Sequence, residues 1–221
     1  MNIEKARFNM IEQQIRPWDV LDAGVLELLG VVRREDFVPP AYRALAFVDT
    51  EVPLPTSTGE AQAMLAPKIE ARLLQELAVH KHERVLEIGT GSGFMAALLA
   101  HKAQHVTSLE IDPELARSAR DNLLHAGVTN ATVIEADGVH GWPADAPFDV
   151  IVLSGSVAEV PADLLAQLKA GGRLVAIVGH EPVMRAVLIT RSGEHGVSRQ
   201  VLFDTVAPRL RGFEEPTRFQ F

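Results

Sequence analysis

Residues 85–94 read VLEIGTGSGF, a short apolar run that leads into alternating glycines. Residues 85–88 are typical of a buried strand, and the FMAALLA run from Phe94 has the pattern of a helix. The glycines between them are Gly89, Gly91 and Gly93. Glycine is needed where the backbone turns sharply or where a ligand approaches so closely that a Cβ would clash. The stretch therefore predicts a strand, a tight turn and a helix, the unit that opens a nucleotide-binding α/β fold.

The same rhythm continues along the chain. Short apolar or β-branched runs predict strands at residues 84–88, 105–111, 131–136, 149–154 and 173–179. Helical patterns at residues 93–102 and 113–127 separate the first three, which implies right-handed βαβ units. Two further runs, residues 186–192 and 200–206, flank GEHG and predict a hairpin. We therefore expect a doubly wound α/β fold with a mostly parallel seven-stranded sheet and an antiparallel hairpin at one edge.

The first 66 residues have a different pattern, and we expect them to form an N-terminal helical cap and an arm. Phe8, Ile11 and Ile15 fall on one face of a helix that Pro17 ends, and Asp22 is placed to cap a second helix. That second helix would carry Val25, Leu26 and Leu29. Residues 34–60 are rich in proline and predict turns and extended chain. Residues 67–221 would form the core domain, which begins with a helix at Pro67.

Composition excludes several classes of protein. The 221 residues are 47% apolar, which is ordinary for a globular fold, and contain no apolar run long enough to cross a membrane. The chain has no cysteine, which rules out disulfides and thiolate metal sites, and we expect no metal and a cytoplasmic location. Its N-terminus lacks the apolar segment of a signal peptide. A net charge of −8 argues against a nucleic-acid partner.

The spacing of the glycines bears on which ligand the turn would hold. A dinucleotide fingerprint, G-x-G-x-x-G, would place its third glycine at position 94, where this chain has Phe94. The pattern here is G-x-G-x-G, with the acidic Glu87 near the end of the strand. A carboxylate there faces an incoming pyrophosphate badly and a cationic ligand well. A structural turn without a ligand is an open alternative on the spacing alone.

Polar residues also follow the next strands. Glu110 ends the second strand, where a carboxylate can accept hydrogen bonds from both hydroxyls of a ribose. Asp137 follows the third strand and is placed to accept from an adenine amino group, while Gly138 leaves room for the ring. Ser154 ends the fourth strand. Because the carboxyl ends of parallel strands meet at one edge of a sheet, these residues predict a nucleoside site there.

With these motifs in place, the sequence resembles the protein-L-isoaspartate O-methyltransferase family of S-adenosylmethionine-dependent methyltransferases. The likeness runs almost end to end: RFNMIEQQIRP, VVRREDFVPPAYRALAFVD followed by PLP, VLEIGTGSGF, EADG and VAPRLRGF. The segment before the glycine loop is the most specific part. The resemblance implies that S-adenosylmethionine is the cofactor and that nine residues bind it: Glu87, Gly89, Gly91 and Gly93 at its methionine end, Glu110, Ile111 and Leu115 at the ribose and adenine, and Asp137 and Gly138 at the adenine edge.

The resemblance also implies an activity, the esterification of isoaspartyl carboxylates in damaged proteins, and one departure bears on it. The family has a threonine–isoleucine–serine triplet in the arm, whereas this chain has Ala63, Met64 and Leu65 there. We therefore predict no catalytic residue. An ionised carboxylate acceptor needs no general base. The expected partner is a peptide or protein bearing isoaspartate; a different methyl acceptor, or cofactor binding without catalysis, are the alternatives. The sequence predicts no oligomeric state.

Overall fold

The computed structural model describes residues 2–193 and 196–213. Its strands are β1 (Val52–Leu54), β2 (Gln62–Met64), β3 (Arg84–Ile88), β4 (His105–Glu110), β5 (Ala131–Glu135), β6 (Phe148–Val157), β7 (Leu168–His180), β8 (Val183–Ser192) and β9 (Gly196–Thr205). Its α-helices are α1 (Ile3–Met10), α2 (Ala23–Val31), α3 (Pro67–Leu77), α4 (Phe94–Lys102), α5 (Pro113–His125) and α6 (Ala162–Ala166).

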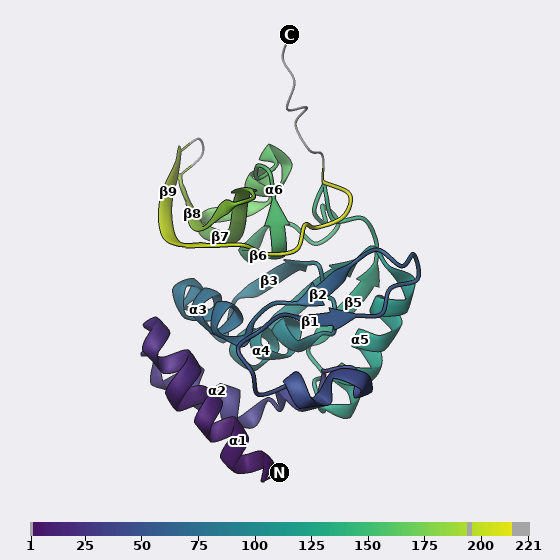
Figure 1. Cartoon of the computed structure of the whole chain (residues 1–221). Coiled ribbons are helices and arrows are strands. Elements are labelled where there is room, and N and C mark those ends of the chain that lie inside the picture. The colour runs from purple at the N-terminus through teal and green to yellow at the C-terminus, as the bar shows by residue number, and fades with distance from the viewer. Residues whose placement is uncertain (1, 194–195, 214–221) are drawn as a thin grey trace.

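Seven strands form one sheet in the order β5-β4-β3-β6-β7-β8-β9 (Figure 1). The pairs from β5 through β7 are parallel, and β8 and β9 join antiparallel at the edge. This arrangement confirms the predicted mostly parallel sheet and its edge hairpin. Glu194 and His195, within the predicted hairpin turn, lie outside the described residues.

Successive residues of the central strands point to opposite faces of the sheet, as the two-residue period of a strand requires. Val85 of β3 belongs to a core that includes residues of α3, α4 and α5, whereas Leu86 belongs to a second core with Leu164 of α6. The second core also takes in Leu210 and Phe213, near the end of the described chain. Both faces of the sheet are thus covered, which fits parallel strands that are apolar on each side.

The N-terminal segment follows the predicted order with one error. The Asp22 carboxylate accepts a hydrogen bond from Val25 N at 2.9 Å and caps α2, as predicted. Phe8, however, is 63% exposed, so its predicted place on the same helix face as Ile11 and Ile15, which are buried, was wrong. The inward position one residue earlier is held by Arg7, which is buried and forms an ion pair with Glu35. Ile11 and Ile15 are buried in a π-helical turn that continues α1.

Strands β1 and β2 form a small antiparallel hairpin that sequence analysis described only as extended chain. Val52 pairs with Met64, and Leu54 pairs with Gln62. Each strand is three residues long and β1 contains Pro53, so neither gives a periodic signal. The hairpin places residues of the arm over the carboxyl ends of the parallel strands.

In the part of the chain that the structure describes, no helix is both long enough and apolar enough to cross a membrane. Nor do histidine and acidic side chains in those residues gather into a group of three or more that could hold a metal ion.

Candidate cofactor pocket and active site

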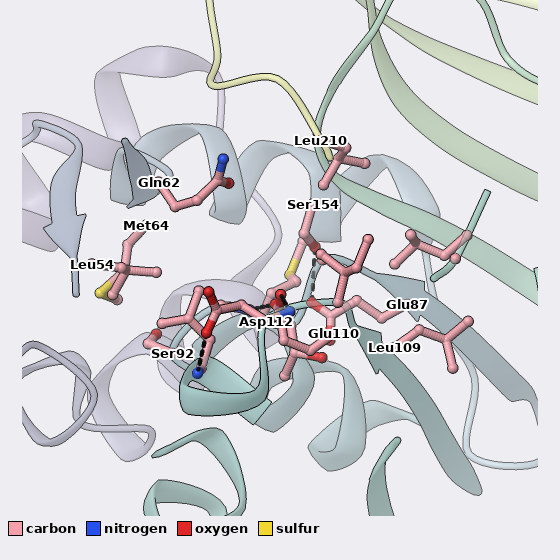
Figure 2. Close-up of a pocket in the computed structure, with 18 of the residues that line it drawn as sticks. Leu54, Gln62, Met64, Glu87, Ser92, Leu109, Glu110, Asp112, Ser154 and Leu210 are labelled. Carbon is pink, nitrogen blue, oxygen red and sulfur yellow. Dashed lines mark hydrogen bonds between the residues drawn. The ribbon is translucent and has the colours of Figure 1, made fainter. Parts of the chain in front are cut away.

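A pocket lies between the β1–β2 hairpin and the carboxyl ends of the parallel strands. Figure 2 shows Leu54, Gln62 and Met64 on the hairpin side of this pocket and Glu87, Glu110 and Ser154 on the sheet side. The predicted residues that line it are Glu87, Gly89, Gly91, Glu110, Ile111, Leu115 and Gly138. Gly93 and Asp137 are the predicted residues that do not line it.

The glycine turn takes the backbone conformation that the sequence requires. Gly89, Gly91 and Gly93 have φ values of +89°, +54° and +87°, a region that side-chain-bearing residues rarely adopt. Gly93 also lets α4 approach α5, because an added Cβ would lie 3.3 Å from Ala119 O. Gly93 thus has a packing role, while Gly89 and Gly91 face the pocket.

Glu87 is fully buried beneath the turn. Its Oε2 accepts a hydrogen bond from Ser108 Oγ at 2.6 Å. Its Oε1 accepts one from Ser154 Oγ at 2.8 Å (Figure 2). Burial raises the pKa of Glu87 to about 8 despite these two hydroxyls, and the neighbouring acids Glu70 and Glu110 add to the rise. Two hydroxyls thus orient the Glu87 carboxyl group beneath the turn, and its buried, acidic surroundings favour the neutral form.

Glu110 ends β4 with both carboxylate oxygens held by backbone groups. Gly91 N donates to Oε2 at 2.8 Å, and Asp112 N donates to Oε1 at 3.0 Å. Burial raises the pKa of Glu110, and these backbone hydrogen bonds oppose the rise. The carboxylate is thus oriented by the glycine turn and fixed at the pocket wall, and its predicted contact with a ribose stays a prediction.

Of the two residues predicted to reach the pocket after β5, only Gly138 lines it. Gly138 packs on Ile88 so closely that an added Cβ would lie 2.4 Å from Ile88 Cγ2, so only glycine fits there. Asp137 is exposed; its Oδ1 accepts a hydrogen bond from Val139 N at 3.0 Å and faces Gly212. The predicted contact of Asp137 with an adenine stays a prediction.

The arm presents an apolar wall in place of hydroxyls. Ala63, Met64 and Leu65 all line the pocket, and the last two are buried in the core as well. The upstream hydroxyls are occupied elsewhere: Thr56 Oγ1 donates to Glu60 O at 2.9 Å within the hairpin, and Ser57 Oγ donates to Asp112. Thr56, Ser57 and Thr58 do not line the pocket, so the hydroxyls upstream in the arm do not replace the missing ones.

The hairpin tip is fastened across the mouth of the pocket, in a set of contacts that we call the tip latch. Asp112 Oδ2 accepts hydrogen bonds from Ser57 N at 2.9 Å and Ser57 Oγ at 2.8 Å. Arg211 bridges Glu60, at 2.7 Å, and Asp112, at 3.5 Å. The other oxygen of Asp112 caps α5 through Glu114 N and Leu115 N. One carboxylate thus joins the arm, the end of the described chain and a helix N-terminus.

Asp112→Ala is expected to lower the free energy of unfolding by about 1–2 kcal/mol, because it removes the N-cap and the partner of Ser57. Burial raises the pKa of Asp112, but the hydrogen bonds from Ser57 and the α5 backbone outweigh it and leave the pKa below its ordinary value. The stabilisation is therefore present at neutral pH and lost as the pH falls through this lowered pKa. Urea titration at pH 7 measures it, with the exposed Asp121→Ala on α5 as control; equal midpoints for the two variants would contradict the role.

Several lining residues were not identified from the sequence. Among them are Gln62 on β2, Glu70 on α3, Asp112 and Arg211. Glu70 did leave a signal, since it falls in register with Leu73, Leu74 and Leu77 on the buried face of α3, where an acid is unexpected. Gln62 and Arg211 left none, because their places depend on how the hairpin and the last described segment fold over the sheet.

Comparison with known proteins gives the family. A model of the protein-L-isoaspartate (D-aspartate) O-methyltransferase family matches residues 5–206. A protein-L-isoaspartate O-methyltransferase of Methanoculleus marisnigri is 42% identical over 190 residues, which are 86% of this chain and 84% of the relative. A second, from Marinobacter nauticus, is 44% identical over 191 residues, 86% of this chain and 85% of the relative.

Solved structures agree on the fold. A protein-L-isoaspartate O-methyltransferase superimposes with a TM-score of 0.78 at 24% identity, covering 93% of this chain and 65% of the other. A Plasmodium falciparum protein described as a β-aspartate methyltransferase, in complex with S-adenosyl-L-homocysteine, superimposes with a TM-score of 0.77 at 20% identity, covering 96% of this chain and 99% of the other. The sequence matches extend this likeness from fold to family: the chain belongs to the protein-L-isoaspartate (D-aspartate) O-methyltransferase family of S-adenosylmethionine-dependent enzymes.

Proposed function

We propose that this protein transfers the methyl group of S-adenosylmethionine to the side-chain carboxylate of isoaspartyl residues in peptides or proteins. The observation that carries the proposal is an open cleft of about 840 Å³ beside the cofactor pocket. The two cavities share the wall residues Leu54, Gln62, Ala63, Leu210 and Arg211. A side chain of a peptide in the outer cleft therefore has a short path to the inner pocket.

The residues that line the inner pocket are suited to the groups of S-adenosylmethionine. In the proposed arrangement Glu110 accepts from the ribose hydroxyls, Gly138 leaves room for the adenine ring, and Gly89 and Gly91 let the backbone approach the methionine portion. Ile111 and Leu115 add apolar surface, and Glu87 supplies an acid at the cationic end. When bound, S-adenosylmethionine supplies an electrophilic methyl group on a sulfonium sulfur.

The chain's own residues then need to orient the acceptor and exclude water. A carboxylate is already ionised at neutral pH, so the absence of a general base among the arm residues costs nothing. Met64 and Leu65 give the inner wall an apolar surface that keeps water away from the reacting oxygen. Most of the rate should come from this positioning, because holding the reactants at near-attack distance removes the entropic part of the barrier.

Gln62 is the group best placed to hold the acceptor carboxylate. It lies on the wall that the two cavities share, half-buried, with its amide directed into the pocket from β2 (Figure 2). The Gln62 amide has no hydrogen-bond partner among the described residues, so its N–H groups are available to a ligand. An amide donor at this point would bind the acceptor in place of the missing arm hydroxyls.

Gln62→Leu is expected to lower kcat/KM for an isoaspartyl peptide roughly 2–12-fold, the effect of one lost hydrogen bond of about 0.5–1.5 kcal/mol. The dissociation constant of S-adenosylhomocysteine should be unchanged. Initial rates and calorimetry measure the two effects, and exposed Gln104→Leu is the matched control. If the variant turns over the peptide as fast as the wild type does, Gln62 does not bind the acceptor.

The function itself is tested by methyl transfer from labelled S-adenosylmethionine to a short isoaspartyl peptide and to its normal aspartyl twin. Base-labile label should enter the isoaspartyl peptide alone. Cofactor binding is measured in the same sample by calorimetry. Label in neither peptide, with the cofactor bound, would overturn the proposed acceptor.

A further inference from the structure

The charged residues that line the inner pocket are mostly acids. Among the residues that the structure describes there, the acids are Glu70, Glu87, Glu110 and Asp112, and the one cation is Arg211. Ionised acids repel an anionic acceptor, and they do so strongly in a pocket that water screens weakly. A carboxylate that is to reach this pocket therefore needs a cation on its path.

Arg211 lies where the two cavities meet. It lines both the inner pocket and the outer cleft, with its side chain 25% exposed. Arg209 also lines the outer cleft but does not reach the inner pocket. Because Arg211 is partly shielded from water, its charge acts more strongly on a ligand than a charge on the open surface does. It is thus placed to act on a side chain that passes from the cleft into the pocket.

The contacts of the tip latch leave one edge of the Arg211 guanidinium open. Its Nε pairs with Glu60 Oε2 at 2.7 Å. Its Nη1 lies 3.5 Å from Asp112 Oδ2, a long contact to an oxygen that already accepts two hydrogen bonds from Ser57. Its Nη2 has no partner in the described part of the chain. The edge formed by Nη1 and Nη2 matches the two oxygens of a carboxylate and is available to one.

We propose that Arg211 binds the carboxylate of the methyl acceptor through Nη1 and Nη2, while Glu60 holds its Nε. The inference rests on the proposed function and identifies the residue that selects an anionic acceptor. Gln62 lies on the same shared wall, so a neutral donor and a charged donor act on one carboxylate. Together they supply the donors that the apolar arm residues lack.

Arg211 also distinguishes the acceptor from the product. Methyl transfer forms a C–O bond at one carboxylate oxygen and breaks the C–S bond of the sulfonium, whose electron pair stays on sulfur. The carboxylate becomes a neutral ester, so its ion pair with Arg211 ends. Because the negative charge is already falling in the transition state, Arg211 stabilises the bound acceptor at least as much as the transition state. Loss of Arg211 should therefore raise KM for the peptide rather than lower kcat.

Two peptides test the proposal, an isoaspartyl peptide and a twin in which the free carboxylate is a carboxamide of the same shape. Calorimetry measures the binding of each to the protein saturated with S-adenosylhomocysteine, where no methyl transfer occurs. The wild type should prefer the isoaspartyl peptide about tenfold, and salt should reduce the preference. In Arg211→Gln the ratio should fall to about one, and KM for the isoaspartyl peptide should rise about tenfold while kcat changes less than about twofold. Arg211→Lys keeps the charge without the two-pronged edge and should retain part of the preference.

Two control variants separate this role from others. Glu60→Gln removes the same ion pair of the tip latch from its other side and leaves the cation in place, so it should keep the preference for the carboxylate. Arg72→Gln controls for the loss of a partly buried arginine, since Arg72 is 19% exposed and pairs with Glu76 at 2.7 Å but lines neither cavity. It should bind both peptides as the wild type does.

Three results would overturn the inference. A preference in Arg211→Gln as large as in the wild type would remove Arg211 from the acceptor site and leave the isoaspartyl activity standing. An equal loss of preference in Glu60→Gln would assign the effect to the tip latch. Wild-type protein that binds S-adenosylhomocysteine but neither binds nor methylates the isoaspartyl peptide would overturn the proposed acceptor as well, so the two failures are distinguishable.

Discussion

Phe94→Ala is expected to lower the free energy of unfolding by about 3–5 kcal/mol, the cost of truncating a buried aromatic ring. Phe94 begins α4, is 1% exposed and packs edge-to-face on Phe37 with the ring centroids 5.5 Å apart. The guanidinium carbon of Arg34 lies over the Phe94 ring, 5.5 Å from its centroid. The ring thus joins the N-terminal segment to the glycine turn, and its loss leaves a cavity where these parts meet.

Guanidinium titration of unfolding measures this loss. Phe8→Ala is the control, because Phe8 is 63% exposed and its truncation should change stability by less than about 0.5 kcal/mol. Phe94 also lines the cofactor pocket, so the variant should bind S-adenosylhomocysteine more weakly even where it is folded. A loss of stability no larger than that of Phe8→Ala would show that the ring is not part of the core.

Glu110→Ala is expected to weaken S-adenosylmethionine binding by about 1–3 kcal/mol, which is roughly 5–150-fold in the dissociation constant. Two causes add. The proposed charge-assisted hydrogen bonds to the ribose are lost. Gly91 N also loses its acceptor, Glu110 Oε2 at 2.8 Å, and this hydrogen bond fixes the glycine turn. The second cause means that a ligand without ribose hydroxyls should also bind less well, but by a smaller factor.

Calorimetry with the cofactor and with its 2′,3′-dideoxy analogue separates the two causes. Glu135→Ala is the matched control, since Glu135 pairs with Glu110 in the β4–β5 register but is exposed. Equal losses for the two ligands would assign the whole effect to the turn. Unchanged affinity for both would remove Glu110 from the site.

The elements of the sheet were predictable because their signals are local. Most strands of the large sheet contain a compact apolar run, and the glycine spacing of residues 89–93 predicts a tight turn in which all three glycines have positive φ. The β1–β2 hairpin was not predictable, because three-residue strands containing Pro53 carry no period. The error at Phe8 has a similar origin: an ideal helical period assigns it to the buried face, and a π-helical turn after Met10 changes that assignment.

The site was predictable to the extent that parallel strands bring their ends to one edge. Glu87, Glu110 and Gly138 reach the pocket by that rule alone. Asp137 shows its limit, because a strand end fixes where the backbone lies and leaves the side chain free to cap its own turn. Residues that come from the hairpin or from the last described segment depend on tertiary contacts, which one sequence does not encode in any short pattern.

The tip latch bears on the order in which the nucleoside and the peptide bind. The outer cleft and the inner pocket share a wall, and Ser57, Asp112 and Arg211 hold the hairpin across the mouth of the inner one. A peptide lying in the outer cleft would cover the route by which a nucleoside enters or leaves. Catalysis would then follow a compulsory order, with the nucleoside first to bind and last to leave, and the tip latch would open once for its entry and once for its exit.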